Sequence, residues 1–169
     1  MEEEWKVVYI ASRQEKKVAV RLAQEGIEHY LPLYQKLSQW SDRKKWVEWP
    51  LFNGYLFVKP TPLQREKVLS LQGVVAFVRY NKADAVVKQT EIDIIQQVLE
   101  SGYTLESYTK PEDFTVGDEV LITEGALIGH KGEILRHNNK EYFLVSFETL
   151  GQSLKIELPA HSFKKTTIE

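Results

Sequence analysis

Residues 49–58 have the sequence WPLFNGYLFV, and this stretch decides how the first half of the chain folds. An apolar run of this length, rich in aromatic and β-branched residues, predicts a buried strand. Asn53-Gly54 interrupts the run, so we expect a turn, a bulge or a close backbone approach at that point. The other elements of the sheet lie on either side of it in the sequence.

The N-terminal side of this stretch predicts a strand followed by a helix. Trp5 to Ala11 is a β-branched and aromatic run, and the spacing of Ser12 and Glu15 is that of a capping box. Apolar residues at helical spacing then predict a helix over about Arg13 to Glu25, with Gly26 at its end.

Two further strands are predicted between this helix and residue 58. His29 to Leu37 and Trp46 to Val58 have the composition of strands, the second with a break at Pro50. The polar segment Ser38 to Lys45 between them predicts a hairpin tip.

The residues after position 60 predict two helices and one more strand. Thr61-Pro62 is suited to start a helix that runs to about Leu71, and Val74 to Tyr80 predicts a strand. A third helix starts at Thr90. Its apolar stripe consists of Ile92, Ile95, Val98 and Leu99. The order of elements predicts an α+β sandwich, in which helices pack on a mainly antiparallel sheet.

The chain is predicted to form two domains, residues 1–100 and 113–169, joined by an irregular linker over 101–112. The second domain contains short strand patterns only: Glu119 to Thr123, Glu133 to His137, Glu141 to Phe147 and Ser153 to Leu158, with Asn138-Asn139 suited to a tight turn. So many short strands predict a small all-β barrel. Glycines and strand-like alternation across this region disfavour a helical state.

Composition limits the classes of function. The 169 residues carry a net charge of −2, and they include no cysteine, which excludes disulfides, thiolate nucleophiles and cysteine zinc sites. Residues 1–110 hold 16 basic and 14 acidic groups and residues 111–169 hold 6 and 10, so we expect the two halves to face different partners. The acidic start and short apolar runs predict a cytoplasmic protein without a membrane span.

Four passages in the same order resemble the NusG family of transcription factors. They are WKVVYIASRQEKKVAVRLAQEGIEHYLPL from residue 5, WPLFNGYLFV from 49, GVVAFVRY from 73 and VGDEVLITEGALIGHKGEIL from 116. The last passage is similar to the KOW motif that opens a small SH3-like barrel. The resemblance implies a NusG N-terminal (NGN) domain followed by a KOW domain. Within the family, the chain looks closest to specialised paralogues such as RfaH and the UpxY regulators, although Asn53 stands where the family usually has proline.

The resemblance implies a site for RNA polymerase. Trp5, Phe52 and Tyr55 match positions that line an apolar patch for the coiled coil of the polymerase β′ clamp helices. A few large rings supply most of the binding energy in such a patch. The alternative is that all three side chains are ordinary core residues.

A cationic cluster predicts contact with nucleic acid. Arg43, Lys44 and Lys45 lie at the expected hairpin tip between Trp40 and Trp46, and phosphate contact combined with base stacking suits a single strand. Further cations on the first helix extend this surface: Arg13, Lys16 and Lys17. The resemblance implies the non-template DNA strand of the transcription bubble as the ligand. A solvated charge cluster without a ligand is the alternative.

No catalytic or metal-binding pattern is found. The four histidines lack metal-ligand spacing, and phosphate-loop and nucleophile-elbow motifs are missing, so we expect neither an enzyme nor a cofactor. The resemblance implies a monomeric elongation and antitermination factor that keeps the polymerase clamp closed and contacts a ribosomal protein or Rho through its KOW domain. The competing interpretation is a KOW-containing RNA-binding accessory protein of the ribosome or of RNA processing.

Overall fold

The chain folds into two compact units, Met1–Ile92 and Asp93–Glu169. The computed structural model describes residues 3–102, 105–108, 115–125, 127–137, 140–157 and 163–165. The division falls within helix α3 (Gln89–Ser101). The domain limits expected from the sequence, at residues 100 and 113, stay a prediction.

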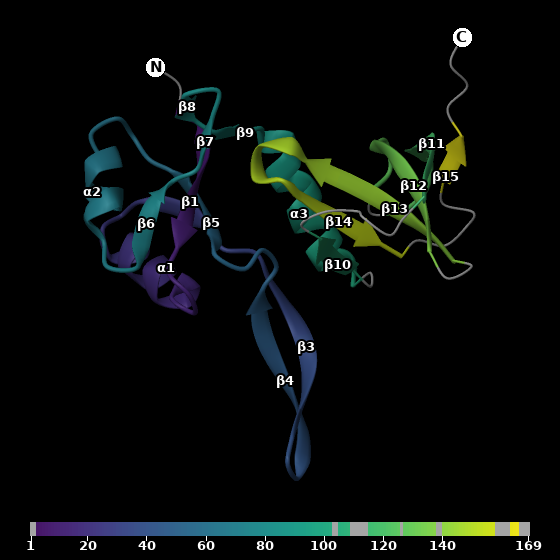
Figure 1. Ribbon diagram of the computed structural model, residues 1–169, viewed down its shortest axis with the longest axis horizontal. Coiled ribbons are helices and arrows are strands. Elements are labelled where there is room, and N and C mark those ends of the chain that lie inside the picture. Colours follow the sequence, from purple (N-terminus) through teal and green to yellow (C-terminus); the bar gives the residue numbers. More distant parts are fainter. Residues whose placement is uncertain are drawn as a thin grey trace. The chain divides into compact units, whose positions relative to one another are not determined.

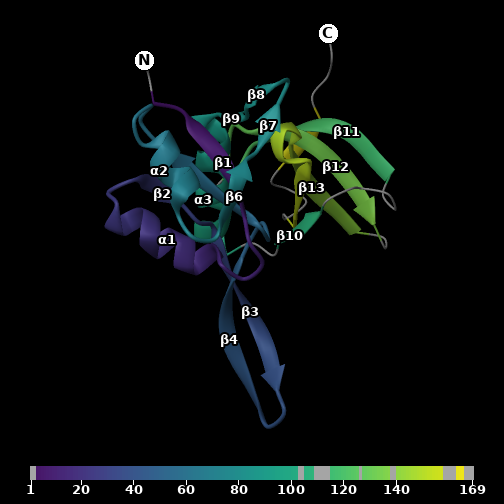
Figure 2. The ribbon, with the colours of Figure 1, turned by 60° about the vertical axis from the view of Figure 1, so that its left-hand side comes forward.

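The first unit is built on an antiparallel sheet with the strand order β2-β5-β1-β6, and β9 also pairs with β1. Its strands are β1 (Trp5–Ile10), β2 (Glu28–Tyr30), β5 (Tyr55–Lys59), β6 (Val74–Phe77) and β9 (Val86–Val87). A short hairpin of β7 (Arg79–Tyr80) and β8 (Ala83–Asp84) follows β6. Helices α1 (Glu15–Gln24) and α2 (Arg65–Ser70) lie beside this sheet in Figure 2.

The hydrophobic core lies between one sheet face and these two helices. Alternate residues of β1, Val8 and Ile10, pack there with Val18 and Leu22 of α1 and Val68 of α2. Tyr9 points to the opposite face because successive side chains of a strand alternate. Both helices therefore bury their apolar faces against this side of the sheet, and Val7 and Phe57 are buried on the opposite side.

Helix α1 begins two residues later than its sequence predicts. Arg13 has a φ of 62°, which is not helical, and the residue before the helix, Gln14, receives no side-chain cap. The carboxylate of Glu15 does not close the expected capping box with Ser12. It turns inward and accepts a hydrogen bond from the Gly54 N–H at 3.0 Å. A tertiary contact has replaced the local one.

The expected interruption at Asn53-Gly54 is confirmed as a turn. Gly54 has a φ of 81°, and its carbonyl accepts the Ile10 N–H at 2.8 Å. A positive φ strains any residue with a Cβ, so glycine suits this position. The turn brings the start of β5 against the end of β1.

Strands β3 (Leu33–Trp40) and β4 (Arg43–Pro50) form a long hairpin that projects from the sheet of the first unit (Figure 1). They pair from Leu33 opposite Pro50 to Trp40 opposite Arg43, so the tip is Ser41-Asp42. The prediction of a tip over Ser38 to Lys45 was therefore wrong. Both faces of this ribbon are largely exposed, which permits polar residues in paired strands.

Helix α2 begins at Arg65, three residues after the predicted start at Thr61-Pro62, and residues 62–64 form a turn. The Thr61 hydroxyl accepts the Gln64 N–H, and the Gln64 side chain accepts the Thr61 N–H in return. Of the expected apolar stripe of α3, Ile92, Ile95 and Val98 are buried, and Leu99 is partly buried. Apolar periodicity predicted this helix because its contacts are continuous along one face.

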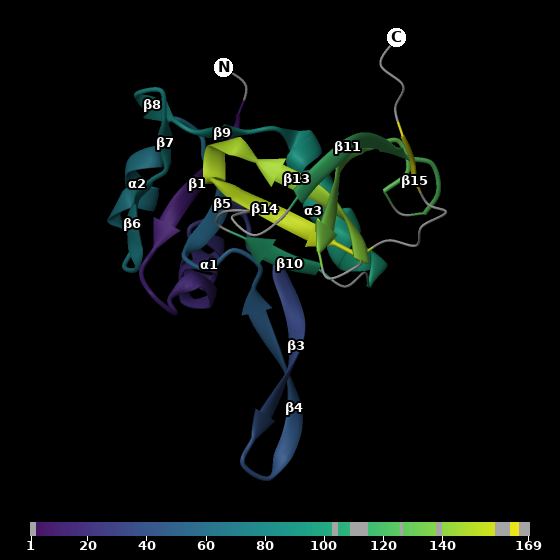
Figure 3. The ribbon, with the colours of Figure 1, turned by 45° about the vertical axis from the view of Figure 1, so that its right-hand side comes forward.

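The second unit contains an antiparallel sheet with the order β10-β14-β13-β12-β11-β15 (Figure 3). Its strands are β10 (Leu105–Tyr108), β11 (Thr115–Ile122), β12 (Lys131–His137), β13 (Lys140–Phe147), β14 (Gln152–Ile156) and β15 (Phe163–Lys165), with a 3-10 turn η1 (Glu148–Leu150). The expected strands of this unit are confirmed, whereas the proposed turn Asn138-Asn139 lies outside the described residues.

A part of the expected linker is a strand. Leu105–Tyr108 form β10 and pair with β14, with Leu105 opposite Ile156. Four residues are too few to show a periodicity, and the partner strand lies far away in the sequence. The remaining linker positions 103–104 and 109–112 lie outside the described residues.

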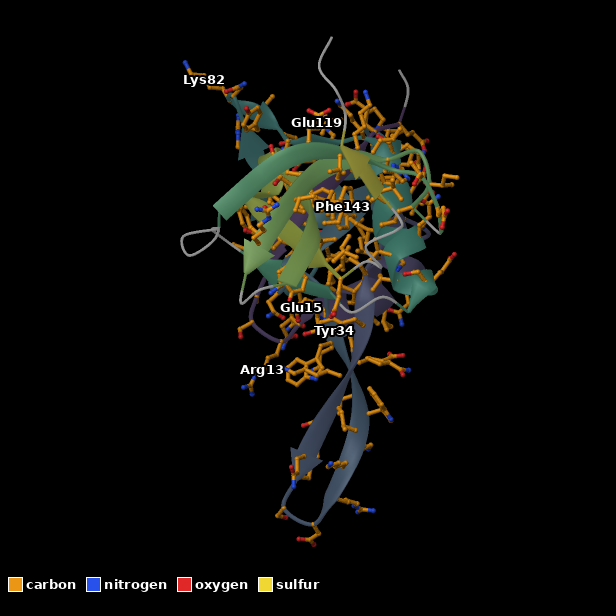
Figure 4. All side chains as sticks on the ribbon, turned by 90° about the vertical axis from the view of Figure 1, so that its right-hand side faces the viewer. Arg13, Glu15, Tyr34, Lys82, Glu119 and Phe143 are labelled. Atoms are coloured by element: carbon orange, nitrogen blue, oxygen red, sulfur yellow. The ribbon has the colours of Figure 1, made fainter. Side chains whose placement is uncertain are left out.

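Close packing explains why one position of this sheet is a glycine. Gly132 lies in β12, and a Cβ there would overlap the Phe143 ring and come within 2.8 Å of the Leu144 carbonyl oxygen. Phe143 itself is fully buried inside the curved sheet (Figure 4).

The two units together confirm the α+β class with mainly antiparallel sheets. In the described residues, no helix is long and apolar enough to cross a membrane.

Candidate functional site

A pair of tyrosines lies on the sheet face opposite α1 and α2. Tyr9 of β1 stands directly across from Tyr55 of β5, and their ring centroids are 5.2 Å apart. Tyr9 is 41% exposed, and Tyr55 is partly buried. We call these two residues the tyrosine patch. Large amphipathic rings held rigidly by a sheet are suited to anchor a protein partner.

Two of the expected patch residues lie in the core. Phe52 is only 2% exposed and packs edge-to-face with Phe57, with ring centroids 6.2 Å apart. Trp5 is also buried, and its indole N–H donates to the Gln89 side chain at 2.7 Å. Phe52 supports the patch from below because its carbonyl accepts the Tyr55 N–H at 3.2 Å.

The hairpin separates its side chains onto two different faces. Residues directly opposite each other in the ladder share a face, as do alternate residues of each strand. One face, which we call the cationic face, therefore carries three cations and three aromatic rings: Lys36, Arg43, Lys45, Tyr34, Trp40 and Trp49. The other face carries Leu37 opposite Trp46 and Gln39 opposite Lys44, and further along it Gln35 opposite Glu48.

The predicted cluster Arg43, Lys44 and Lys45 is thus divided. All three side chains are exposed, but Lys44 lies on the face opposite to the other two. Trp40 and Trp46, each 64% exposed, also lie on different faces. Alternating cations and rings on a single exposed face are suited to hold phosphates and stack bases of a single strand.

A cavity of about 610 Å³ lies at the base of the hairpin, within the first unit. It is bounded by the loop before α1, the first turn of α1, the end of β4 and the Asn53-Gly54 turn. The lining side chains that matter most are Arg13, Lys16, Trp49 and Pro50. Figure 4 shows Arg13 and Glu15 where the hairpin joins the sheet unit, with Tyr34 nearby.

The cations predicted on α1 have different surroundings. Lys16 reaches the hairpin and donates from Nζ to the Glu48 carbonyl at 2.9 Å. Arg13 is exposed and lines the cavity, whereas Lys17 is exposed but is not part of the lining. The structure therefore brings Arg13 and Lys16 together at the base of the hairpin.

A partly buried cluster of ion pairs joins three elements of the first unit. Asp84 of β8 accepts two bonds from Arg65, at 2.8 and 3.0 Å, and one from Lys6 of β1 at 3.3 Å. The hydrogen bonds from Arg65 lower the pKa of the Asp84 carboxyl below its ordinary value, and Lys6 adds to the effect. The Arg65 guanidinium also lies 4.8 Å from the centre of the Phe77 ring. This arrangement stabilises the short β7-β8 hairpin.

Metal binding has no support in the part of the chain that the structure describes. No three histidine, aspartate or glutamate side chains gather there around a common point.

Comparison with known families identifies the family of the chain. Residues 3–96 match the sequence model of the family described as the transcription termination factor NusG. The chain belongs to the NusG family. The matched range includes the whole tyrosine patch, the hairpin and the cavity at its base. NusG proteins are transcription factors, and this chain is a transcription elongation factor of NusG type.

A solved structure of a NusG protein has a similar fold. A structure titled "Domain interaction in Thermotoga maritima NusG" is 21% identical and covers 99% of both chains, with a TM-score of 0.61. A chain of an MjSpt4:Spt5 complex is 18% identical and covers 98% of this chain and 99% of that one, with a TM-score of 0.31.

Several site residues escaped the sequence-based prediction. Tyr9 could have been predicted, because side chains of a strand alternate between its faces and Tyr9 therefore lies on the same face of β1 as Trp5. Trp49 and Asp84 could not, because their roles depend on segments that meet only in the folded chain. The Asp84 cluster joins positions 78 and 19 residues apart in sequence.

Proposed function

We propose that the NGN unit binds RNA polymerase through the tyrosine patch. The observation that carries this proposal is the Tyr9–Tyr55 pair on the sheet face opposite α1 and α2, with Tyr9 exposed and Tyr55 partly buried, in a chain of the NusG family. The partner is the coiled coil of the polymerase β′ clamp helices. Its apolar side chains would pack against the two rings while the phenol groups stay at the wet edge of the contact.

Phe52 and Trp5 act in this proposal as supports rather than as contacts. A side chain that is 2% exposed offers almost no surface to a partner. Phe52 instead holds Tyr55 through a backbone hydrogen bond and packs under β5 through Phe57. Binding therefore depends on Phe52 only through the position and stability of Tyr55.

Polymerase binding gives the chain its effect on transcription. A protein that bridges the cleft of the enzyme holds the clamp closed around nucleic acid and so disfavours pausing and termination. This action requires binding energy but no chemistry. We assign the chain to the operon-specific NusG paralogues on the likeness of three passages, the SRQEKK start of its first helix, the SDRKKWVEWPLF hairpin and the GVVAFVRY strand.

The cationic face of the hairpin binds the non-template DNA strand. Arg43 and Lys45 contact phosphates, and Trp40 lies opposite Arg43 on the same face to stack on a base. Exposed cations bind phosphates with strong salt dependence, and ring stacking adds a contact that tolerates any base. Lys44, on the other face, is not needed for this contact.

The β-rich second unit contacts a different partner, a ribosomal protein or Rho. Its sequence carries an excess of acidic residues, which disfavours nonspecific contact with nucleic acid. Division of the two tasks between two units follows the division of charge along the chain.

Transcription in vitro tests the proposed effect. A single-round reaction with purified bacterial RNA polymerase, on a template with a known pause site and terminator, measures pause lifetime and readthrough. We expect the full chain to shorten the pause and increase readthrough, and the Tyr9→Ala/Tyr55→Ala chain to do neither. An unchanged pause and unchanged readthrough with the wild-type chain, at saturating concentration, would refute an antitermination role.

A further inference from the structure

We propose that the cavity at the base of the hairpin binds one unstacked base of the DNA strand that lies along the cationic face. The inference deepens the nucleic-acid contact proposed above and rests on it. The base would stack on Trp49, and its phosphate would lie against Arg13 and Lys16. The cavity thus adds one contact with single-stranded DNA to the contacts that the hairpin cations make.

The size and walls of the cavity suit a nucleotide. Its volume of about 610 Å³ lies within the range of small-molecule sites, roughly 300–1,000 Å³. The wall is apolar and aromatic where Ile10, Trp49 and Pro50 line it, and polar where Ser12 and Asn53 line it. Trp49 is 44% exposed, so its indole ring offers an open surface to a flat ligand.

The charge of the cavity suits a phosphate. Its lining contains two cations, Arg13 and Lys16, and one carboxylate, Glu15. The Glu15 side chain is buried and accepts the Gly54 N–H, which turns one of its oxygens away from any ligand. Lys16 and the exposed Arg13 provide a positive rim, which attracts an anion.

The cavity is held in shape by bonds between the segments that form it. Lys16 of α1 donates to the Glu48 carbonyl of β4, and Glu15 of α1 holds the Gly54 turn. Gly54 in turn accepts the Ile10 N–H at the end of β1. A preformed site loses less conformational entropy on binding than a site that must be ordered first.

The position of Trp49 on the hairpin favours nucleic acid over an acidic peptide as the ligand. Arg43, Lys45 and Trp49 are on the same face of β4, because they are separated by even numbers of residues. Six residues of strand span about 20 Å, so a single DNA strand that follows this face from its tip reaches the cavity. An acidic peptide needs cations but not the row of rings that accompanies them.

Two matched pairs of variants test the proposal. Trp49→Ala removes the stacking ring of the cavity, and Trp46→Ala removes an exposed ring from the opposite face of the same strand. Arg13→Asn and Lys82→Asn each remove one cation at a position with positive φ, 62° and 68°, where asparagine is tolerated. Trp49→Phe keeps an aromatic plane and serves as the rescue variant.

The measurement uses the full chain and a fluorescent 12-residue oligodeoxythymidylate. We expect Trp49→Ala, which removes the stacking ring, and Arg13→Asn, which removes a phosphate contact, each to weaken binding by about fivefold to tenfold. Trp46→Ala and Lys82→Asn should change it by less than about twofold, and Trp49→Phe should recover most of the loss. Circular dichroism confirms that each variant is folded.

Photocrosslinking locates the base. The same oligonucleotide with 5-iododeoxyuridine is irradiated on the wild-type chain, and tandem mass spectrometry assigns the modified residue. Crosslinks at Trp49 support the proposal.

Crosslinks confined to Trp40 or Trp46, or equal affinities within the two matched pairs, overturn the cavity site but leave the hairpin as a DNA surface. If Arg13→Asn weakens polymerase binding but not DNA binding, the cavity proposal is overturned, and an acidic peptide of the polymerase becomes the ligand of the cavity. If the wild-type chain binds no single-stranded DNA at all, the cavity site and the proposed DNA contact both fail, while polymerase binding by the tyrosine patch is unaffected.

Discussion

At the scale of single residues, Glu15 shows how one carboxylate connects separate parts of the first unit. Its position three residues after Ser12 fits a capping box, yet it is buried and bonded to the Gly54 N–H. A helix N-terminus in water can be capped by solvent, whereas a buried N–H without an acceptor costs free energy. The hydrogen bond to Gly54 therefore stabilises the fold more than a capping bond at Ser12 would.

We predict that Glu15→Ala lowers the free energy of unfolding by about 1–3 kcal/mol, because it leaves the Gly54 N–H without its acceptor. Glu15→Gln retains a side-chain oxygen at the same position and should cost less than the alanine variant. Urea titration of the full chain, followed by circular dichroism, measures both. Equal losses for the two variants would show that the hydrogen bond is not the cause.

Phe52 provides a second prediction at this scale. We expect Phe52→Ala to destabilise the first unit by about 3–5 kcal/mol, since a fully buried ring is lost and a cavity remains. Tyr55→Ala, at a partly exposed position, should cost clearly less. Thermal unfolding distinguishes them, and a stable Phe52→Ala chain that has lost polymerase affinity would instead assign Phe52 to the contact surface.

At the scale of elements, the Asp84 cluster ties the β7-β8 hairpin to α2 and β1. The pKa of Asp84 is lowered by Arg65 first and by Lys6 second. A lowered pKa in the folded state means that the carboxylate stabilises the fold above its ordinary pKa of 3.8. That stability is lost as the pH falls below 3.8 toward the pKa of the folded state.

We therefore predict that Asp84→Asn lowers the free energy of unfolding by roughly 1 kcal/mol at pH 6, a small value because Arg65 is partly exposed to solvent. The difference from the wild type should shrink as the pH falls below about 4. Asp42→Asn, in the exposed hairpin turn, removes a carboxylate outside the cluster and is the control. A difference for Asp84→Asn that stays constant from pH 6 to pH 3 would contradict the account.

The hairpin yields a prediction about its two faces. Trp40 and Trp46 are equally exposed but lie on opposite faces. We expect Trp40→Ala to weaken binding of a single-stranded oligonucleotide by about fivefold or more, and Trp46→Ala to leave it nearly unchanged. Fluorescence anisotropy over a range of salt concentrations measures both. Equal effects of the two substitutions would mean that the strand does not follow one face.

At the scale of the whole molecule, the sequence was most informative where contacts are regular. The β-branched and aromatic run of Trp5–Ile10 and the apolar stripe of α3 predicted both elements, because the strand is buried on both faces and the helix along one face. The sequence was misleading in the hairpin, whose exposed strands are as polar as a loop, and at Arg13, which has a positive φ instead of a helical one. It also missed the cavity, because its lining comes from segments about 40 residues apart.

The central claim is that the tyrosine patch binds RNA polymerase, and its most direct test is the affinity of the full chain for the core enzyme. Biolayer interferometry would compare wild type with Tyr9→Ala/Tyr55→Ala, and with Tyr80→Ala, which removes an exposed tyrosine from β7. We predict a loss of about thirtyfold or more for the double variant, since truncation of an interface anchor costs about 2 kcal/mol. Tyr80→Ala should stay within about twofold of wild type. A folded double variant that binds the polymerase as tightly as the wild-type chain would contradict the account.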